Sequence, residues 1–150
     1  MKKFKFSLDS VLSYKEQMLD VLKGEHAVLL GEIRAQEERL ADCWARYRAY
    51  NEEYCRRSRE GLPITEALIC QSSLRAMERE IQQETTNLET LRTKEEKKRE
   101  EVVEARKETS SIEKLKEKKL TDYRKAEAKS EELFVEEFVS MTRLMEAPGT

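Results

Sequence analysis

The chain has 150 residues, of which 40% are charged and 7% aromatic, and its 29 Lys and Arg against 31 Asp and Glu give a formal net charge of -2. Such a balance provides no bulk attraction for nucleic acid or for an anionic membrane. The length suits one domain, but a compact globule would need more apolar residues, and long helices and coiled coils have this composition. Disorder is the competing interpretation, and the periodicity of the apolar residues decides between the two.

Two long segments free of proline flank a single break in the chain. Residues 1–60 contain only two glycines, and residues 64–147 contain neither glycine nor proline. Both residue types disfavour helix interiors, so we predict one helix at about 8–59 and a second at about 66–146. The turn signal Gly61-Leu62-Pro63 predicts a tip at about 60–64. The expected fold is all-α: a long antiparallel two-helix coiled-coil hairpin in a single domain, with a C-terminal helical overhang.

Apolar residues in the first segment recur at alternating spacings of four and three. This repeat is that of an a/d seam between two helices. The one histidine of the chain, His26, lies on the seam, so we expect it to pack there. The predicted seam positions are Leu8, Leu12, Lys15, Leu19, Leu22, His26, Leu29, Ile33, Gln36, Leu40, Cys43, Tyr47, Tyr50 and Tyr54.

The second segment carries the same repeat, with polar positions at Glu95 and Lys98. After Ile112 the repeat blurs, because Leu115 and Leu120 stand beside the expected positions. An interruption of this kind predicts a local change in supercoil. The predicted seam positions are Ala67, Cys70, Leu74, Met77, Ile81, Glu84, Leu88, Leu91, Glu95, Lys98, Val102, Ala105, Thr109 and Ile112, with recovery at Tyr123, Ala126 and Leu133.

The two predicted helices differ in length. At about 1.5 Å per residue the first spans about 80 Å and the second about 120 Å. With the tip at Gly61, the numbers of facing residues sum to roughly 123. Leu8 then lies near Leu115, and residues beyond about Lys119 have no intramolecular partner. The resulting overhang, Tyr123 to Met145, carries apolar residues on more than one narrow stripe. Such a face indicates a partner, and folding back or self-association is the alternative. Its apolar residues are Leu133, Phe134, Val135, Phe138, Val139, Met141, Leu144 and Met145.

A basic cluster of Arg56, Arg57 and Arg59 precedes the tip. The simplest interpretation is a solvated charged surface. The alternative is a docking contact for an acidic partner.

The sequence offers no catalytic or metal-binding pattern. The scattered glycines form no phosphate-binding loop, and two helices provide no pocket for a Ser-His-Asp or Cys-His site. The odd number of cysteines, Cys43, Cys55 and Cys70, argues against a disulfide scaffold or a zinc site, and we expect free thiols. No apolar run approaches membrane-spanning length, and the basic start lacks the apolar core of a signal peptide. We expect a cytoplasmic protein that is not an enzyme and has no cofactor.

Three segments resemble the bacterial flagellar FliJ family. Residues 4–15 (FKFSLDSVLSYK) are similar to the start of those proteins, a basic-aromatic leader followed by Leu, two polar residues and Val-Leu. Tyr47, Tyr50 and Tyr54 precede the glycine turn, and residues 113–118 (EKLKEK), followed by Tyr123, resemble a lysine-rich segment of the family. The match spans the whole chain. One departure is the pair at 136–137, two glutamates inside an apolar run where the family often ends in a polar segment.

The resemblance implies a function. FliJ is the stalk-like component of the flagellar type III export ATPase complex, without activity of its own. It binds the ATPase hexamer and promotes its activity, reaches the membrane-embedded export gate, and is linked to export chaperones. We therefore expect a monomer at the flagellar base, peripheral to the membrane. The family's gate contact corresponds by position to Ser73, Met77, Glu80 and Glu84. The expected ATPase-facing end comprises Leu8, Leu12, Leu133, Phe134, Phe138, Met141, Leu144 and Met145.

Other interpretations stay open. The chain could be the equivalent stalk of a virulence type III secretion injectisome, although the basic-aromatic leader favours the flagellar version. It could instead be a structural coiled coil forming parallel homodimers, in which Gly61-Leu62-Pro63 is a kink in an open rod longer than roughly 200 Å.

Overall fold

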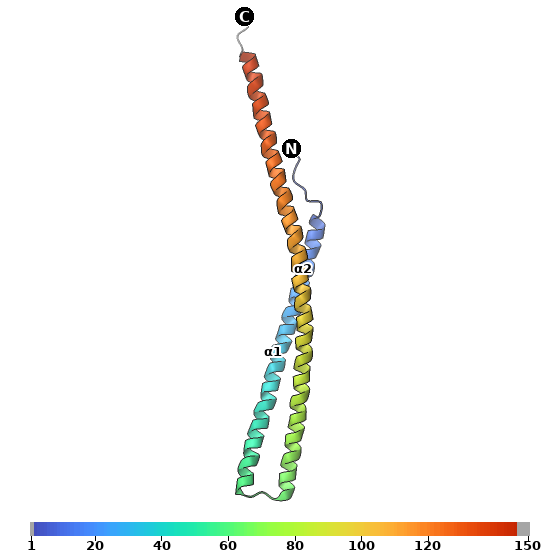
Figure 1. Ribbon diagram of the computed structural model, residues 1–150, viewed down its shortest axis with the longest axis vertical. Coiled ribbons are helices and arrows are strands. Elements are labelled where there is room, and N and C mark those ends of the chain that lie inside the picture. Colours follow the sequence, from blue (N-terminus) through green and yellow to red (C-terminus); the bar gives the residue numbers. More distant parts are fainter. Residues whose placement is uncertain (1, 147–150) are drawn as a thin grey trace. The chain divides into compact units, whose positions relative to one another are not determined.

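The protein folds into two long helices joined by a short tip (Figure 1). The structure is a computed structural model and describes residues 2–146. Helix α1 spans Asp9–Glu60 and helix α2 spans Ile64–Glu146, and no strand occurs within the described range. The two helices pack against each other, so the expectation of an all-α helical hairpin is confirmed, and an open rod with a kink at Gly61 is wrong.

Backbone hydrogen bonds explain where each helix begins. The amide of Leu12 donates to the carbonyl oxygen of Leu8 at 2.8 Å, so the first turn of α1 begins at Asp9. The amide of Ala67 donates to the carbonyl oxygen of Pro63 at 2.9 Å, and α2 therefore begins before the expected position of about 66. Proline at this point costs no helical hydrogen bond, because the first amides of a helix have no intrahelical acceptor.

Gly61 makes the reversal of the chain possible. It directly follows the last residue of α1 and has φ of 102°, the one positive φ among the described residues. Residues with a Cβ are disfavoured in this region, and glycine is the usual residue just after a helix that ends this way. Leu62 and Pro63 complete the tip before α2 starts.

The chain divides into two units, and each helix contributes to both. The tip unit comprises residues 20–103, and the terminal unit comprises the residues up to 19 together with those from 104 onward. Inside each unit the α1 and α2 segments run antiparallel. Contacts in the tip unit join Arg57 to Glu66 at 2.7 Å and Lys98 to Glu25 at 2.8 Å. The residue numbers of each pair add up to 123, so the expected register is confirmed.

The predicted seam is buried or half-buried throughout the tip unit. Every seam position from Leu22 to Tyr54 on α1, and from Ala67 to Val102 on α2, is at least partly buried. Ile81 and Leu88 are among the most buried, with 7% and 4% of their surface exposed. The heptad pattern therefore identified the packed face of both helices.

Three polar contacts interrupt this apolar seam. The Gln36 amide, 5% exposed, donates to the Glu84 carbonyl oxygen at 3.0 Å and also to its carboxylate. Nε2 of His26 lies 2.9 Å from Oε1 of Glu95. Lys98 pairs with Glu25. Partnered polar groups in a seam cost less than unpartnered ones and help to fix the register of two helices. His26 thus lies on the seam as expected, where it contacts a carboxylate.

In the terminal unit the stripe of α2 that meets α1 shifts after Ile112, where the sequence predicts a local change in supercoil. Between Ile112 and Ala128 the positions that are at least half-buried are Lys116, Leu120, Tyr123 and Glu127, whereas Leu115 is 37% exposed. Two successive spacings of four shift the stripe, which is a stutter of the heptad repeat and changes the winding locally. The expected recovery is met at Tyr123, which is half-buried, but Ala126 is exposed and Glu127 is half-buried in its place. Leu133 is exposed, and it lies in the segment expected to have no intramolecular partner.

The N-terminal leader extends the covered part of α2 beyond Lys119, where sequence reasoning ended it. The rings of Phe4 and Tyr123 lie 5.5 Å apart between centroids, and the Tyr123 hydroxyl donates to the Lys2 carbonyl oxygen. Phe6 is buried, with 7% exposed. The leader is not helical, and an extended chain covers about 3.3 Å per residue against about 1.5 Å in a helix. A few leader residues therefore reach farther along α2 than the helical register implies.

Candidate functional site

The C-terminal part of α2 carries most of the exposed large apolar side chains described for the terminal unit. Every residue from 128 to 141 is exposed. Phe134 is 70% exposed, Phe138 65% and Met145 84%. Because Tyr123 and Glu127 are half-buried, the uncovered segment is shorter than the predicted overhang, Tyr123 to Met145. From here on, the overhang means residues 128–146. Large aromatic and aliphatic side chains exposed in such a cluster mark interaction surfaces, and its apolar residues are Leu133, Phe134, Val135, Phe138, Val139, Met141, Leu144 and Met145.

Four of these side chains form a stripe that continues the covered face of α2. At about 100° per residue, Phe134, Phe138, Met141 and Met145 fall on the same side of the helix as Tyr123. Tyr123 is covered by the leader. Glu127 and Ser130 follow on the same face, and the apolar stripe begins at Phe134. The stripe thus has the spacing of one half of a helix–helix seam, and no other part of residues 2–146 covers it.

The overhang is also acidic. Between residues 130 and 142 it has four glutamates, at 131, 132, 136 and 137, and no Lys or Arg. Within residues 2–146 none of these four takes part in an ion pair. Glu131 borders a shallow hollow with Phe134 and Val135, and Glu137 borders another with Met141 and Leu144. The surface combines apolar side chains with unpaired negative charge.

Leu8 and Leu12, expected at the same end, do not join this face. Leu12 is 5% exposed and belongs to the seam with α2. Leu8 is 37% exposed and lies just before α1, whose first charged residue Asp9 pairs with Lys116 at 2.8 Å. These two residues are thus part of the packed terminal unit, and the overhang contributes its surface alone.

The residues assigned by position to a gate contact lie toward α1. Ser73, Met77 and Glu84 are half-buried. Glu84 accepts from Gln36, and the Glu80 carboxylate accepts from Arg46 at 3.1 Å. The four residues share one stretch of α2 in the tip unit, but they do not form an outward apolar face.

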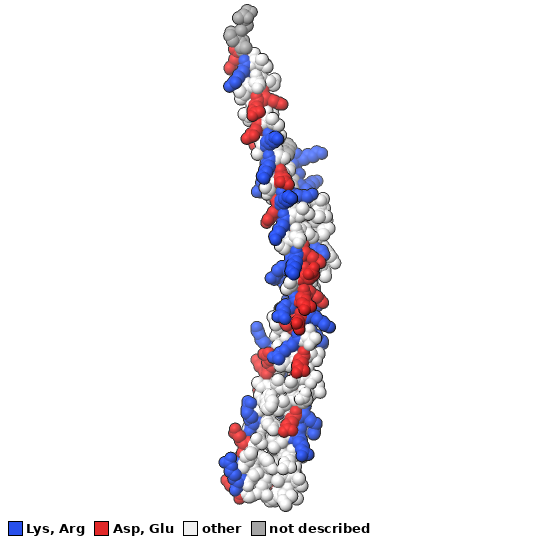
Figure 2. Space-filling view, in the orientation of Figure 1, with Lys and Arg blue, Asp and Glu red and all other residues white. Residues whose placement is uncertain are grey.

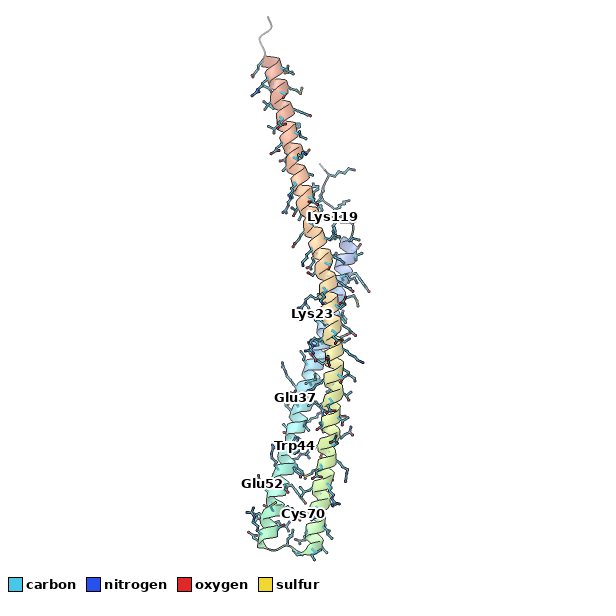
Figure 3. The ribbon with its side chains drawn as sticks, viewed as in Figure 1. Lys23, Glu37, Trp44, Glu52, Cys70 and Lys119 are labelled. Carbon is cyan, nitrogen blue, oxygen red and sulfur yellow. The ribbon has the colours of Figure 1, made fainter. Side chains whose placement is uncertain are left out.

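Exposed apolar residues gather near the start of α2, where the sequence analysis assigned no interaction surface. Ile64, Leu68 and Ile69 are 79%, 60% and 65% exposed, within the first two turns after the tip. On α1, Trp44 is 42% exposed and packs edge-on against Tyr47, with ring centroids 5.9 Å apart (Figure 3). The available signal was an apolar residue standing off the heptad stripe, a position that should otherwise be polar.

The arginines near the tip are largely matched by acids. Arg56 pairs with Glu53 at 2.5 Å and with Glu60 at 3.1 Å, and Arg57 pairs with Glu66 at 2.7 Å. The hydrogen bond from Arg56 lowers the pKa of Glu53 below its usual value. These pairs support the solvated interpretation of the cluster over a docking site for an acidic partner. On the face seen in Figure 2, positive and negative side chains are interspersed in the same way along the chain.

No metal cluster and no membrane span is found among residues 2–146. No group of His, Cys, Asp and Glu is placed to hold a metal ion, and neither α1 nor α2 has a window apolar enough to cross a bilayer. All three cysteines are free thiols. Burial raises the pKa of the Cys43 thiol, and the nearby Glu80 carboxylate adds to the effect, so this thiol is a poor nucleophile at neutral pH.

A helical hairpin with an apolar segment left uncovered has the architecture of a coiled-coil adaptor. The model of a family described as Flagellar FliJ protein matches residues 4–145, and the chain belongs to this family of non-catalytic, stalk-like proteins associated with flagellar export. Neither a curated protein nor a solved structure matches the chain.

Proposed function

We propose that this protein is the stalk of the flagellar type III export ATPase complex, where it binds the ATPase hexamer and promotes ATP hydrolysis. The observation that carries the proposal is the overhang, a helix whose apolar stripe continues a packed seam and has no partner among residues 2–146. Family membership supplies the setting, since it associates the chain with flagellar export. The protein would act in the cytoplasm at the flagellar base, peripheral to the membrane, and as a monomer when free.

We further propose that the early part of α2 links the ATPase to the export gate and to export chaperones. The positions carried over from the family are Ser73, Met77, Glu80 and Glu84. Two of them are engaged by α1, as Glu80 accepts from Arg46 and Glu84 from Gln36. A partner would have to displace these contacts or bind beside them. The adjacent exposed residues Ile64, Leu68 and Ile69 would supply the apolar part of such a contact.

The test is ATP hydrolysis by the purified flagellar export ATPase with the full-length protein and with a chain ending at Glu132. The truncation removes side chains that are almost all exposed, so it should leave the packed seam intact, which circular dichroism checks. We expect stimulation by the full chain and little by the truncated chain. A double variant at exposed apolar residues of α1 in the tip unit, V21A/V28A, is the control and should stimulate normally. Equal binding and stimulation by the truncated chain would refute the assignment.

The virulence injectisome remains the alternative setting for the same architecture. Family membership favours the flagellar system. If the protein stimulated only an injectisome ATPase, the setting would be wrong although the stalk role would stand.

A further inference from the structure

The overhang also indicates the surface chemistry of the partner that would cover it. Its stripe of Phe134, Phe138, Met141 and Met145 extends the face of α2 that the leader covers up to Tyr123. A partner occupying the stripe would therefore continue an existing helix–helix seam. Side chains of such a partner would enter the hollows beside Phe134 and Met141, as knobs enter holes in a coiled coil.

Charge defines the edges of the same surface. Glu131 and Glu137 lie on opposite sides of the stripe, each about 60° from Phe134 around the helix. Each also borders one of the hollows. A partner whose side chains fill these hollows would bring its own edge groups close to both carboxylates. Neutral or acidic edges would leave these charges partly desolvated and unpaired, which is costly.

We propose that the overhang docks into an apolar groove of a protein partner whose two edges carry Lys or Arg, opposite Glu131 and Glu137. The inference rests on the proposed function and specifies the surface chemistry of the ATPase site that receives the stalk. An anionic membrane does not suit the overhang, because its glutamates would be repelled. A second copy does not suit it either, because each overhang carries five glutamates against only Lys129 and Arg143, so two copies would bring ten acids together with four bases.

The experiment measures binding of full-length protein to the purified flagellar export ATPase by calorimetry, at roughly 50 and 300 mM NaCl. The test variant is E131K/E137K. The control, E96K/E100K, makes the same change in charge at two exposed acids of the tip unit that form no ion pair within the described residues. At low salt we expect the test variant to bind at least tenfold more weakly than wild type, and the control to bind within about twofold of wild type.

Salt provides an independent readout. Screening shortens the reach of exposed charges from about 14 Å to about 6 Å over this range. We expect wild-type binding to weaken severalfold as salt rises, and binding of E131K/E137K to stay constant or tighten, because its repulsion is screened. The apolar contribution is tested by F134A/F138A, which should weaken binding at least tenfold at both salt concentrations.

Each failure is distinguishable. If wild type does not bind the ATPase, the proposed function falls and this inference falls with it. If wild type and the chain ending at Glu132 bind equally, the overhang is not the docking segment. If truncation abolishes binding but E131K/E137K binds like wild type, the stalk role stands and basic edges are refuted. If light scattering shows a wild-type dimer that F134A/F138A dissolves, a second copy covers the stripe and the inference is also refuted.

Discussion

One substitution, glycine to alanine, should have opposite effects at different points of the hairpin. Gly24 and Gly31 lie inside α1, and a Cβ built at either position meets no atom within 4 Å. Alanine removes backbone freedom that glycine has in the unfolded chain, which stabilises a helix interior by roughly 0.5–1 kcal/mol. The two sites are about 10 Å apart along the helix, so their effects should add. We expect G24A/G31A to be more stable by about 1–2 kcal/mol.

Gly61 should respond in the other direction. Its added Cβ would also meet no atom within 4 Å, but its φ is 102°. An L-residue in the left-handed region costs roughly 1–2 kcal/mol, so G61A should lose about that much stability through backbone strain alone. The space around the glycine is thus the same in all three cases, and the backbone conformation decides whether alanine stabilises or destabilises the protein.

Urea unfolding followed by circular dichroism at 222 nm measures both effects. Wild type, G24A/G31A and G61A should have equal m-values, so that a shift of the urea midpoint reports a change in stability. For a chain of this length, a gain of about 1–2 kcal/mol corresponds to a thermal midpoint raised by roughly 2–8 °C. A destabilised G24A/G31A would show that the two glycines are needed for close packing. An unchanged G61A would show that the tip does not adopt the described reversal.

Three further predictions concern packing, thiols and pH. Leu88, 4% exposed in the tip unit, should cost about 2–3 kcal/mol when changed to alanine, whereas Leu68, 60% exposed, should cost less than about 0.5 kcal/mol in the same urea assay; equal costs would contradict the seam. Iodoacetamide should alkylate the exposed Cys55 well before Cys43, which is buried and has a raised pKa, and mass spectrometry of the native protein would expose the reverse order. The depressed pKa of Glu53 means that its arginine pair stabilises the fold above the usual pKa of 4.5 and that this contribution is lost as pH falls through the lower folded pKa, so E53Q should lose less stability than wild type on acidification below about pH 4.5 in denaturant titrations.

The packed seam could be predicted from the sequence because its heptad pattern recurs along both helices. One misplaced residue, such as a polar Gln36 on the seam, does not obscure a heptad pattern that spans the whole tip unit. The reversal was equally readable, because Gly61 and Pro63 stand between two segments that otherwise lack both turn signals. The register then followed from the position of the tip alone, and the pair of Arg57 and Glu66 agrees with it.

Features that occur once could not be predicted in this way. The contact of Phe4 with Tyr123 depends on a non-helical leader, whose path has no period. The interruption after Ile112 could be read from the sequence, but the half-burial of Lys116 and Glu127 beyond it could not. Residue type alone does not show where long charged side chains cover apolar surface. The exposed group at Ile64, Leu68 and Ile69 stands off the heptad stripe, so the seam periodicity does not indicate it.

Some residues of the candidate site could be predicted from the sequence and others could not. The overhang could be predicted because the second helix is longer than the first and carries many apolar residues beyond the paired part. Leu12 was assigned to the same end from its position in the chain, and its burial in the seam follows from the same heptad that places Leu19 there.

The central claim is that the overhang is the surface that meets the export ATPase. Hydrogen–deuterium exchange of the full-length protein, measured by mass spectrometry with and without the ATPase hexamer, tests it most directly. The account predicts that amides of residues 128–146 become protected on binding, while those of residues 64–77 in the tip unit do not change. Protection confined to the tip unit, with the overhang exchanging as in the free protein, would contradict it.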